Sequence, residues 1–176
     1  MFKLAGGDGV GVALGEDHDS DGNPTIYLGT QNGPIFRFIT GYTSIRPTGT
    51  SSQFVTYFYL DPDNNNVLYY AALSRLLKTN NALTVTPTTW DDLGAGLQNI
   101  RSMATTRGTY DPDNSYLFIG DQGGNVLRIK DPQNATSLVI DGKILHHLLQ
   151  QLQKQAVLEK KRNRHRWTID HSIVRT

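Results

Sequence analysis

Asp61-Pro62-Asp63-Asn64-Asn65-Asn66-Val67-Leu68-Tyr69-Tyr70-Ala71 is an acidic turn followed by a short apolar run, and this pattern occurs three times in the chain. One copy begins at Asp19-Ser20-Asp21 and another at Asp111-Pro112-Asp113, so the first aspartates lie 42 and 50 residues apart. In every copy a turn and a second strand-like run come after the first. A period of about 40 to 50 residues indicates a repeat protein whose unit is a small antiparallel sheet.

Short apolar or alternating runs bounded by turn residues predict up to four strands in each repeat. These runs are 10–14, 25–29, 34–39 and 42–45, then 53–60, 67–72, 76–79 and 88–93, then 100–106, 116–120, 126–129 and 137–140. The sequence therefore predicts an all-β fold: a partial β-propeller of about three four-stranded antiparallel blades, at 9–46, 53–93 and 100–140 within residues 1–141. Because a closed ring needs four or more blades, we expect either a piece of a longer propeller or a homo-oligomer.

The acidic turns have a structural explanation. Proline after Asp61 and after Asp111 sets φ near about −65° at the second position of a turn, and the flanking carboxylates can accept backbone N–H bonds. A carboxylate pair that stood alone would suggest a glycosidase acid and base. Because the pair recurs in each repeat, we predict that Asp61, Asp63, Asp111 and Asp113 cap backbone groups.

Composition sets further limits. The 176 residues include 17 glycines and no cysteine. Frequent turns suit a β protein, and the lack of thiols excludes disulfides, thiolate nucleophiles and thiolate metal sites. The sequence contains no secretory signal pattern and no run of about 18 apolar residues, so we expect a soluble chain without a membrane span.

The composition and charge of the chain change after Gly142. Residues 1–142 have a net charge of −5, whereas residues 143–176 have a net charge of +6. Apolar residues then recur at three- and four-residue steps, at Ile144, Leu145, Leu148, Leu149, Leu152, Ala156 and Val157. This spacing predicts an amphipathic basic helix over 142–166, followed by a short tail at 167–176.

The repeats resemble those of BNR or Asp-box β-propellers, which occur in sialidases, sortilin-type receptors and xyloglucanases. The similarity lies in three stretches: Tyr59–Tyr70, Arg75–Thr79 leading to Thr89–Leu93, and Tyr110–Gly120. The chain departs from the Asp-box turn, because the segment between Lys78 and Trp90 contains neither its aspartate nor its glycine. The resemblance implies a propeller and a secreted or extracellular location, but no particular activity.

The first acidic turn also matches a metal-binding pattern. Asp17-His18-Asp19-Ser20-Asp21-Gly22 begins like a calcium loop, in which alternating carboxylates converge and a glycine permits the turn. It is similar to the loops of FG-GAP and VCBS propeller repeats. Position twelve is Leu28, which cannot supply the carboxylate of an EF-hand. Two interpretations are open: a Ca²⁺ site formed by Asp17, Asp19 and Asp21, or an acidic turn without metal.

The basic C-terminal segment is a second candidate site. Lys160, Lys161, Arg162 and Arg164 precede Trp167 and could contact nucleic acid, an anionic membrane or an acidic partner. The alternative is a solvated helix end whose apolar stripe covers an open blade edge.

These observations leave three functional hypotheses. The first is a non-catalytic binding or scaffolding module for carbohydrate or protein, with Tyr42, Tyr57, Tyr59, Tyr110 and Trp90 as candidate contacts. The second is a fragment of a glycoside hydrolase-type propeller enzyme. The third is a polyanion-binding protein that acts through its basic C-terminal segment.

Overall fold

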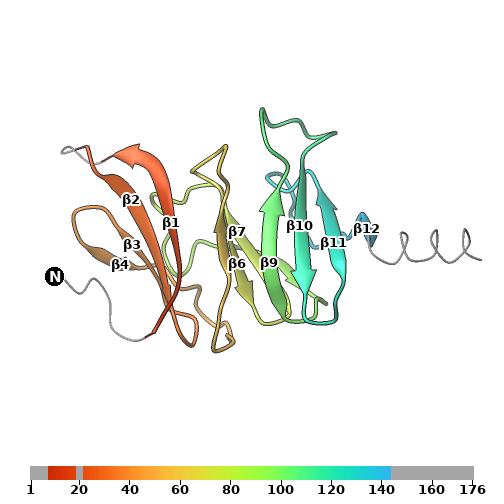
Figure 1. Cartoon of the computed structure of the whole chain (residues 1–176), viewed down its shortest axis with the longest axis horizontal. Helices are drawn as coiled ribbons and strands as arrows, with labels where there is room; N and C mark the ends of the chain where they lie inside the picture. Colours follow the sequence, from red (N-terminus) through yellow and green to blue (C-terminus); the bar gives the residue numbers. More distant parts are fainter. Residues whose placement is uncertain (1–7, 19–21, 144–176) are drawn as a thin grey trace, which may run out of the picture. The chain divides into compact units, whose positions relative to one another are not determined.

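The computed structural model describes residues 8–18 and 22–143, which form an all-β structure of three separate antiparallel sheets (Figure 1). The first sheet has the order β1-β2-β3-β4. Its strands are β1 (Gly9–His18), β2 (Pro24–Thr30), β3 (Ile35–Phe38) and β4 (Tyr42–Ser44).

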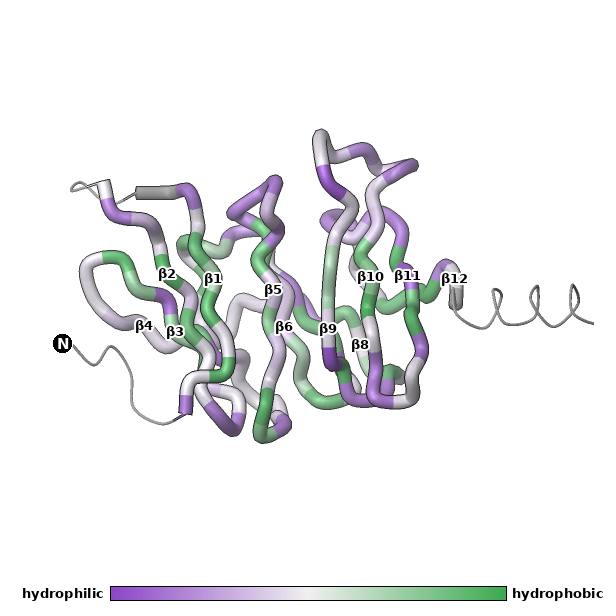
Figure 2. The backbone as a smooth tube through the Cα atoms, viewed as in Figure 1, coloured by the Kyte–Doolittle hydropathy of each residue, from purple (hydrophilic) through white to green (hydrophobic). Residues whose placement is uncertain are grey.

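The second and third sheets repeat this meander. The second has the order β5-β6-β7-β8, with β5 (Phe58–Leu60), β6 (Leu68–Ala72), β7 (Arg75–Thr79) and β8 (Asp91–Ala95). The third contains β9 (Ile100–Thr105), β10 (Tyr116–Asp121) and β11 (Val126–Lys130), with the two-residue β12 (Gly142–Lys143) at its edge. Figure 2 shows hydrophobic residues concentrated in the strands and hydrophilic ones in the turns that join them.

The middle sheet is covered on both faces. Successive residues of β6 belong to two different cores because side chains alternate along a strand. Tyr69 packs with Ile119 and other residues of the third sheet. Tyr70 packs with Tyr27 and other residues of the first sheet. Every residue of β6 is therefore buried.

The first strands of the sheets approach one another most closely. The main contacts between strands of different sheets join β1 to β5 and β5 to β9. The cross-strand pair Gly11 and Gly29 leaves room for the ring of Phe58. A Cβ atom at Gly29 would lie 2.9 Å from Cε1 of that ring, closer than carbon atoms pack.

Loops fill the space between the sheets near their later strands. Ala82 and Val85, between β7 and β8, pack in the core shared by the first two sheets. Ala135, Leu138 and Ile140, after β11, pack against the core shared by the second and third sheets. The first strands of neighbouring sheets are therefore close together, and loops fill the wider space between their later strands.

The predicted all-β fold of small antiparallel sheets is confirmed, but one predicted strand is absent and the predicted strand 53–60 forms only over its last three residues, β5. Residues 53–57 precede β5 without strand structure, because Phe54 O accepts the N–H of Asn32 from the turn after β2. Residues 137–140 also form no strand, since Leu138 N–H donates to Leu93 O of the second sheet. The observed β8 begins three residues later than the predicted run at 88–93.

The predicted helix over 142–166 and the tail at 167–176 lie outside the described residues, apart from β12. In the part of the chain that the structure describes, no helix is long and apolar enough to span a bilayer.

Candidate functional site

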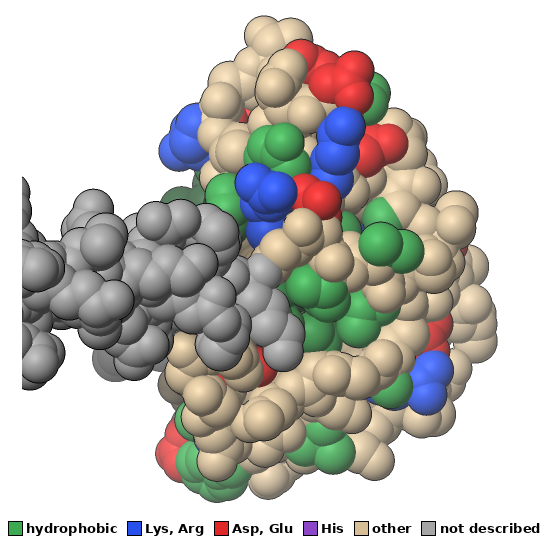
Figure 3. Space-filling view, turned by 90° about the vertical axis from the view of Figure 1, so that its right-hand side faces the viewer, with side chains coloured by type: hydrophobic (Ala, Val, Ile, Leu, Met, Phe, Trp, Pro, Cys, Tyr) green, Lys and Arg blue, Asp and Glu red, His purple; other side chains and the backbone are tan. Residues whose placement is uncertain are grey.

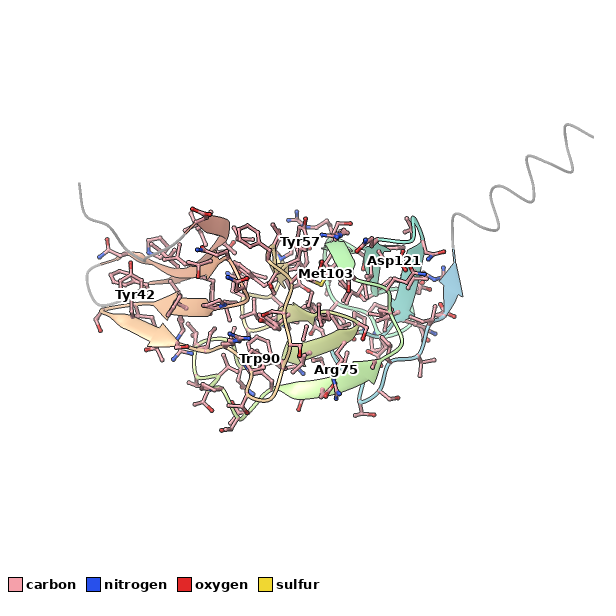
Figure 4. All side chains as sticks on the ribbon, turned by 90° about the horizontal axis from the view of Figure 1, so that it is seen from below. Tyr42, Tyr57, Arg75, Trp90, Met103 and Asp121 are labelled. Atoms are coloured by element: carbon pink, nitrogen blue, oxygen red, sulfur yellow. The ribbon has the colours of Figure 1, made fainter. Side chains whose placement is uncertain are left out.

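A hollow of about 180 Å³ lies beside Trp90, where the loop after β4 meets β7 and β8 of the middle sheet. Two loops and the start of two strands line it: Pro47, Thr48, Gly49, Thr50, Arg75, Leu77, Pro87, Thr88, Trp90 and Asp92. Figure 4 shows Trp90 and Arg75 on the same side of the sheets, with Tyr57 and Met103 on the opposite side.

The indole of Trp90 is held in place from two directions. Its Nε1–H donates to Ile45 O at 2.8 Å, and its ring lies 5.9 Å from the ring of Tyr70. Burial raises the pKa of Tyr70 to about 12, and its hydroxyl donates to Gly33 O. Trp90 thus connects the hollow to the core of the first two sheets, and its half-buried ring offers an apolar wall.

The two loops around the hollow are joined to each other. Thr48 donates from both its N–H and its hydroxyl to Pro87 O. The hydroxyl of Thr50 donates to Pro47 O, which closes the first loop on itself. These hydroxyl oxygens keep lone pairs that can accept hydrogen bonds from a ligand.

An ion pair supplies charge at the hollow. Arg75 on β7 pairs with Asp92 on β8, and both side chains are partly exposed. The second carboxylate oxygen of Asp92 accepts the N–H of Gly94, which fixes the orientation of the carboxylate. A guanidinium has five N–H donors, so Arg75 retains donors for a further partner.

In both described turns the first aspartate holds backbone, as predicted, whereas Asp113 accepts a hydrogen bond from the Lys130 side chain. Asp61 Oδ1 accepts the N–H of Asp63 at 3.0 Å, and Asp111 Oδ1 accepts the N–H of Asp113 at 2.9 Å. The first turn also lines a cavity of about 20 Å³, which has room for about one water molecule and none for a sugar.

The turn at Asp63 has an additional function that its sequence does not reveal. The carboxylate accepts two hydrogen bonds from Arg107, each 2.9 Å long, and one from Gly108 N–H. Hydrogen bonding to Arg107 holds the pKa of Asp63 below its usual value. Because Arg107 comes after β9, this contact joins the second sheet to the third.

The other predicted aromatic contacts are spread over the molecule. Tyr59 lies hydrogen-bonded to Thr105 on β9, and Tyr110 donates to Asp131. Tyr57 packs against the core of the second and third sheets. Tyr42 is exposed on the first sheet, where its ring contacts Phe38. Of the five aromatic residues, Trp90 is the one that lines the hollow.

The predicted calcium loop falls at the β1–β2 hairpin. Asp17 belongs to β1, whereas Asp19 and Asp21 lie outside the described residues. Gly22 has φ of 78°, which agrees with the turn that the sequence predicts there. Among the residues whose side chains the structure describes, no group of three or more acidic or histidine side chains could hold a metal ion. The basic residues Lys160, Lys161, Arg162, Arg164 and Trp167 also lie outside the described residues.

One repeated pair of residues escaped the sequence analysis. In each sheet an aromatic residue on the second strand stands opposite a cation on the third: Tyr27 with Arg37, Tyr69 with Lys78, and Phe118 with Arg128. Tyr27 and Tyr69 face the following sheet and are fully buried. Each of these residues can be read in the sequence, but only the strand register shows that the aromatic residue and the cation stand opposite each other.

No protein-family model matches this chain, and comparison with curated proteins finds no match either.

Proposed function

We propose that this chain is a non-catalytic binding module, built as a partial β-propeller, that binds carbohydrate in the hollow beside Trp90. The hollow carries the proposal because it combines an immobilised indole with an exposed guanidinium, a carboxylate and several hydroxyls. Sugars present an apolar face of C–H groups and a rim of hydroxyls. An aromatic ring can pack against the apolar face, and a guanidinium or carboxylate can hydrogen-bond the hydroxyls.

The size of the hollow limits the ligand. About 180 Å³ is below the roughly 300 Å³ at which pockets for drug-sized ligands begin. One sugar unit, such as the end of a glycan chain, is therefore the portion that we expect to be enclosed. The remainder of the glycan would stay in solvent.

The packing of the three sheets supports the propeller part of the proposal. Each sheet is an antiparallel meander of neighbouring strands, and the second packs by its two faces on the first and third. The first strands are close together, whereas loops separate the later strands. Blades around a common axis have this arrangement, with their first strands nearest the axis.

A glycan array followed by calorimetry with the best neutral oligosaccharide tests the binding function. We expect binding to the full chain and a loss of roughly 10- to 150-fold in affinity for Arg75→Gln, because a hydrogen bond to a charged group is worth about 1.5–3 kcal/mol. Arg101→Gln is the matched control, since Arg101 is an exposed arginine that bonds only Gln122 among the described residues.

Trp90→Phe is the second variant of this test. It keeps an aromatic ring but removes the Nε1–H that bonds Ile45 O, so we expect weaker binding with retained β structure by circular dichroism. Equal affinities for Arg75→Gln, Arg101→Gln and the unchanged chain would contradict this site. A reducing-sugar assay on the same oligosaccharide distinguishes a binding module from a glycoside hydrolase, because turnover would contradict a non-catalytic module.

A further inference from the structure

No described sheet packs over one face of the third sheet, and this face is called its uncovered face below. Phe118 and Arg128 occupy the positions that Tyr69 and Lys78 occupy in the middle sheet. Tyr69 is fully buried against the third sheet, whereas Phe118 is only half-buried. Tyr116 and Val126 lie on the same uncovered face, because they alternate with the buried residues Leu117 and Leu127.

The cations of the first two sheets show which contacts this face lacks. Arg37 donates to Ala82 O at 3.0 Å and to Val85 O at 3.1 Å, and both acceptors belong to the following sheet's loop. Lys78 donates in the same way to Gln133 O after β11. In both repeats the cation therefore binds backbone carbonyls of the next sheet.

Among the described residues, the partners of Arg128 come from its own sheet and the segment after it. Its guanidinium lies 4.6 Å from the ring centroid of Tyr116 and pairs with Asp141 at 2.7 Å. Its Nε is buried and has no hydrogen-bond partner among the described residues. Within the described residues Arg128 therefore makes no contact of the kind by which Arg37 and Lys78 bind the following repeat.

On the first sheet, too, one face has no described sheet over it, and this uncovered face has a complementary character. Strand register places six apolar side chains and one tyrosine on this face: Val12, Leu14, Ile26, Leu28, Phe36, Phe38 and Tyr42. Ile26 and Leu28 occupy the positions of Leu68 and Tyr70, which the preceding sheet buries in the middle repeat. A contiguous apolar face of this kind on a soluble protein marks an interaction surface.

From these observations we propose that the uncovered face of the third sheet packs on the uncovered face of the first sheet of a second copy. Two copies joined head to tail at both faces would bring six sheets together, within the four to eight blades of propellers. The inference rests on the partial-propeller arrangement proposed above and is independent of the glycan ligand.

The two faces suit each other chemically. The aromatic cluster of Phe36, Phe38 and Tyr42 has ring separations of 6.3 Å and 5.1 Å around Tyr42. An arginine over such rings gains cation–π energy, and the short loop between β3 and β4 offers backbone carbonyls. Figure 3, which views the side where β12 lies, shows hydrophobic side chains beside Lys or Arg and Asp or Glu side chains.

Sedimentation equilibrium of the full chain over a wide range of concentration tests the association. We expect a mass of two 19.6 kDa chains at the higher concentrations. Val12→Glu should return the protein to a monomer, whereas Phe54→Glu should leave the dimer intact. Phe54 is the control because it is 60% exposed, close to the 65% of Val12, and precedes β5 of the middle sheet.

A mixing experiment tests the head-to-tail arrangement. Val126→Glu should also disrupt the dimer, because Val126 lies on the other face. When the Val12→Glu and Val126→Glu chains are mixed, one of the two interfaces regains unaltered faces on both sides, so association should return in part. If each face instead bound the same face of a second chain, mixing would give no such recovery.

Several outcomes overturn the proposal. A monomer at all concentrations would show that the faces do not bind a second copy. A ladder of ever larger species would exclude a ring closed by two copies, and a dimer that survives both glutamate variants would place the contact elsewhere. Retained β structure by circular dichroism distinguishes loss of association from loss of folding.

Discussion

The middle and third sheets carry the same aromatic–cation pair but bury it to different extents. Tyr69 is enclosed between two sheets, whereas its counterpart Phe118 is half-buried and no described sheet covers it. Lys78 bonds the following repeat, and burial lowers its pKa. The partners of Arg128 within the described ranges all lie near its own sheet. Equivalent residues should therefore contribute differently to the free energy of unfolding. A further sheet packs over the second repeat, whereas none of the described residues packs in that way over the third.

Truncation of the two aromatic residues should show the largest difference. Tyr69→Ala removes a fully buried ring and should lower the free energy of unfolding by about 3–5 kcal/mol. Phe118→Ala should cost only about 1 kcal/mol when the protein is dilute, because its ring is half-buried. Urea denaturation at low protein concentration measures both.

Tyr69→Phe is the control for this comparison. The hydroxyl of Tyr69 is buried without a hydrogen-bond partner among the described residues, and burial raises its pKa. Its removal should therefore be neutral or slightly stabilising. Similar losses for Tyr69→Ala and Phe118→Ala in dilute solution would show that the third sheet is covered even in the monomer.

The next largest effect should come from the close approach of the first two sheets. Gly29→Ala places a Cβ atom against the ring of Phe58 and should cost about 1–3 kcal/mol by overpacking. Gly9→Ala on the same sheet meets no atom within 4 Å and serves as the control. If the cost arises at Phe58, a Phe58→Leu background should reduce it. Thermal melting of the unchanged protein, the three single variants and the Gly29→Ala, Phe58→Leu double variant checks this.

The sequence allowed the fold class to be predicted because turns and strand alternation are local properties. Asp61-Pro62-Asp63 and its later copy mark the starts of equivalent hairpins, and their capping hydrogen bonds form within a few residues. Residues 137–140 could not be placed in the same way, since Leu138 bonds Leu93 from another repeat. A local sequence pattern cannot predict a contact between residues of two different repeats.

The candidate site was predictable only in part. Trp90 was a candidate as an aromatic residue near a strand end, but Arg75 and the loop at 47–50 were not. They reach the hollow because β7 pairs with β8 and because Thr48 bonds Pro87 across 39 residues of sequence. The bidentate contact of Asp63 with Arg107 likewise depends on the packing of two repeats.

The smallest effect should appear in acid, at the two aspartate turns. The pKa of Asp63 is lowered mainly by Arg107, and that of Asp111 mainly by the side chain of Asn114. A carboxylate with a lowered folded pKa stabilises the protein above its unfolded pKa of about 3.9, and this contribution is lost as the pH falls through the folded value. Melting temperature should therefore fall below about pH 4 more steeply in the unchanged protein than in Asp63→Asn.

The two turns can be separated by their partners. In an Arg107→Gln background, Asp63→Asn should change the acid limb little, because the main cause of the lowered pKa has already been removed. Asp111→Asn should keep its full effect there, since Asn114 lies in its own turn. Added salt should weaken the exposed Asp63–Arg107 contact, so an acid limb that is unaffected by both salt and Arg107→Gln would mean that Asp63 does not join the sheets in solution.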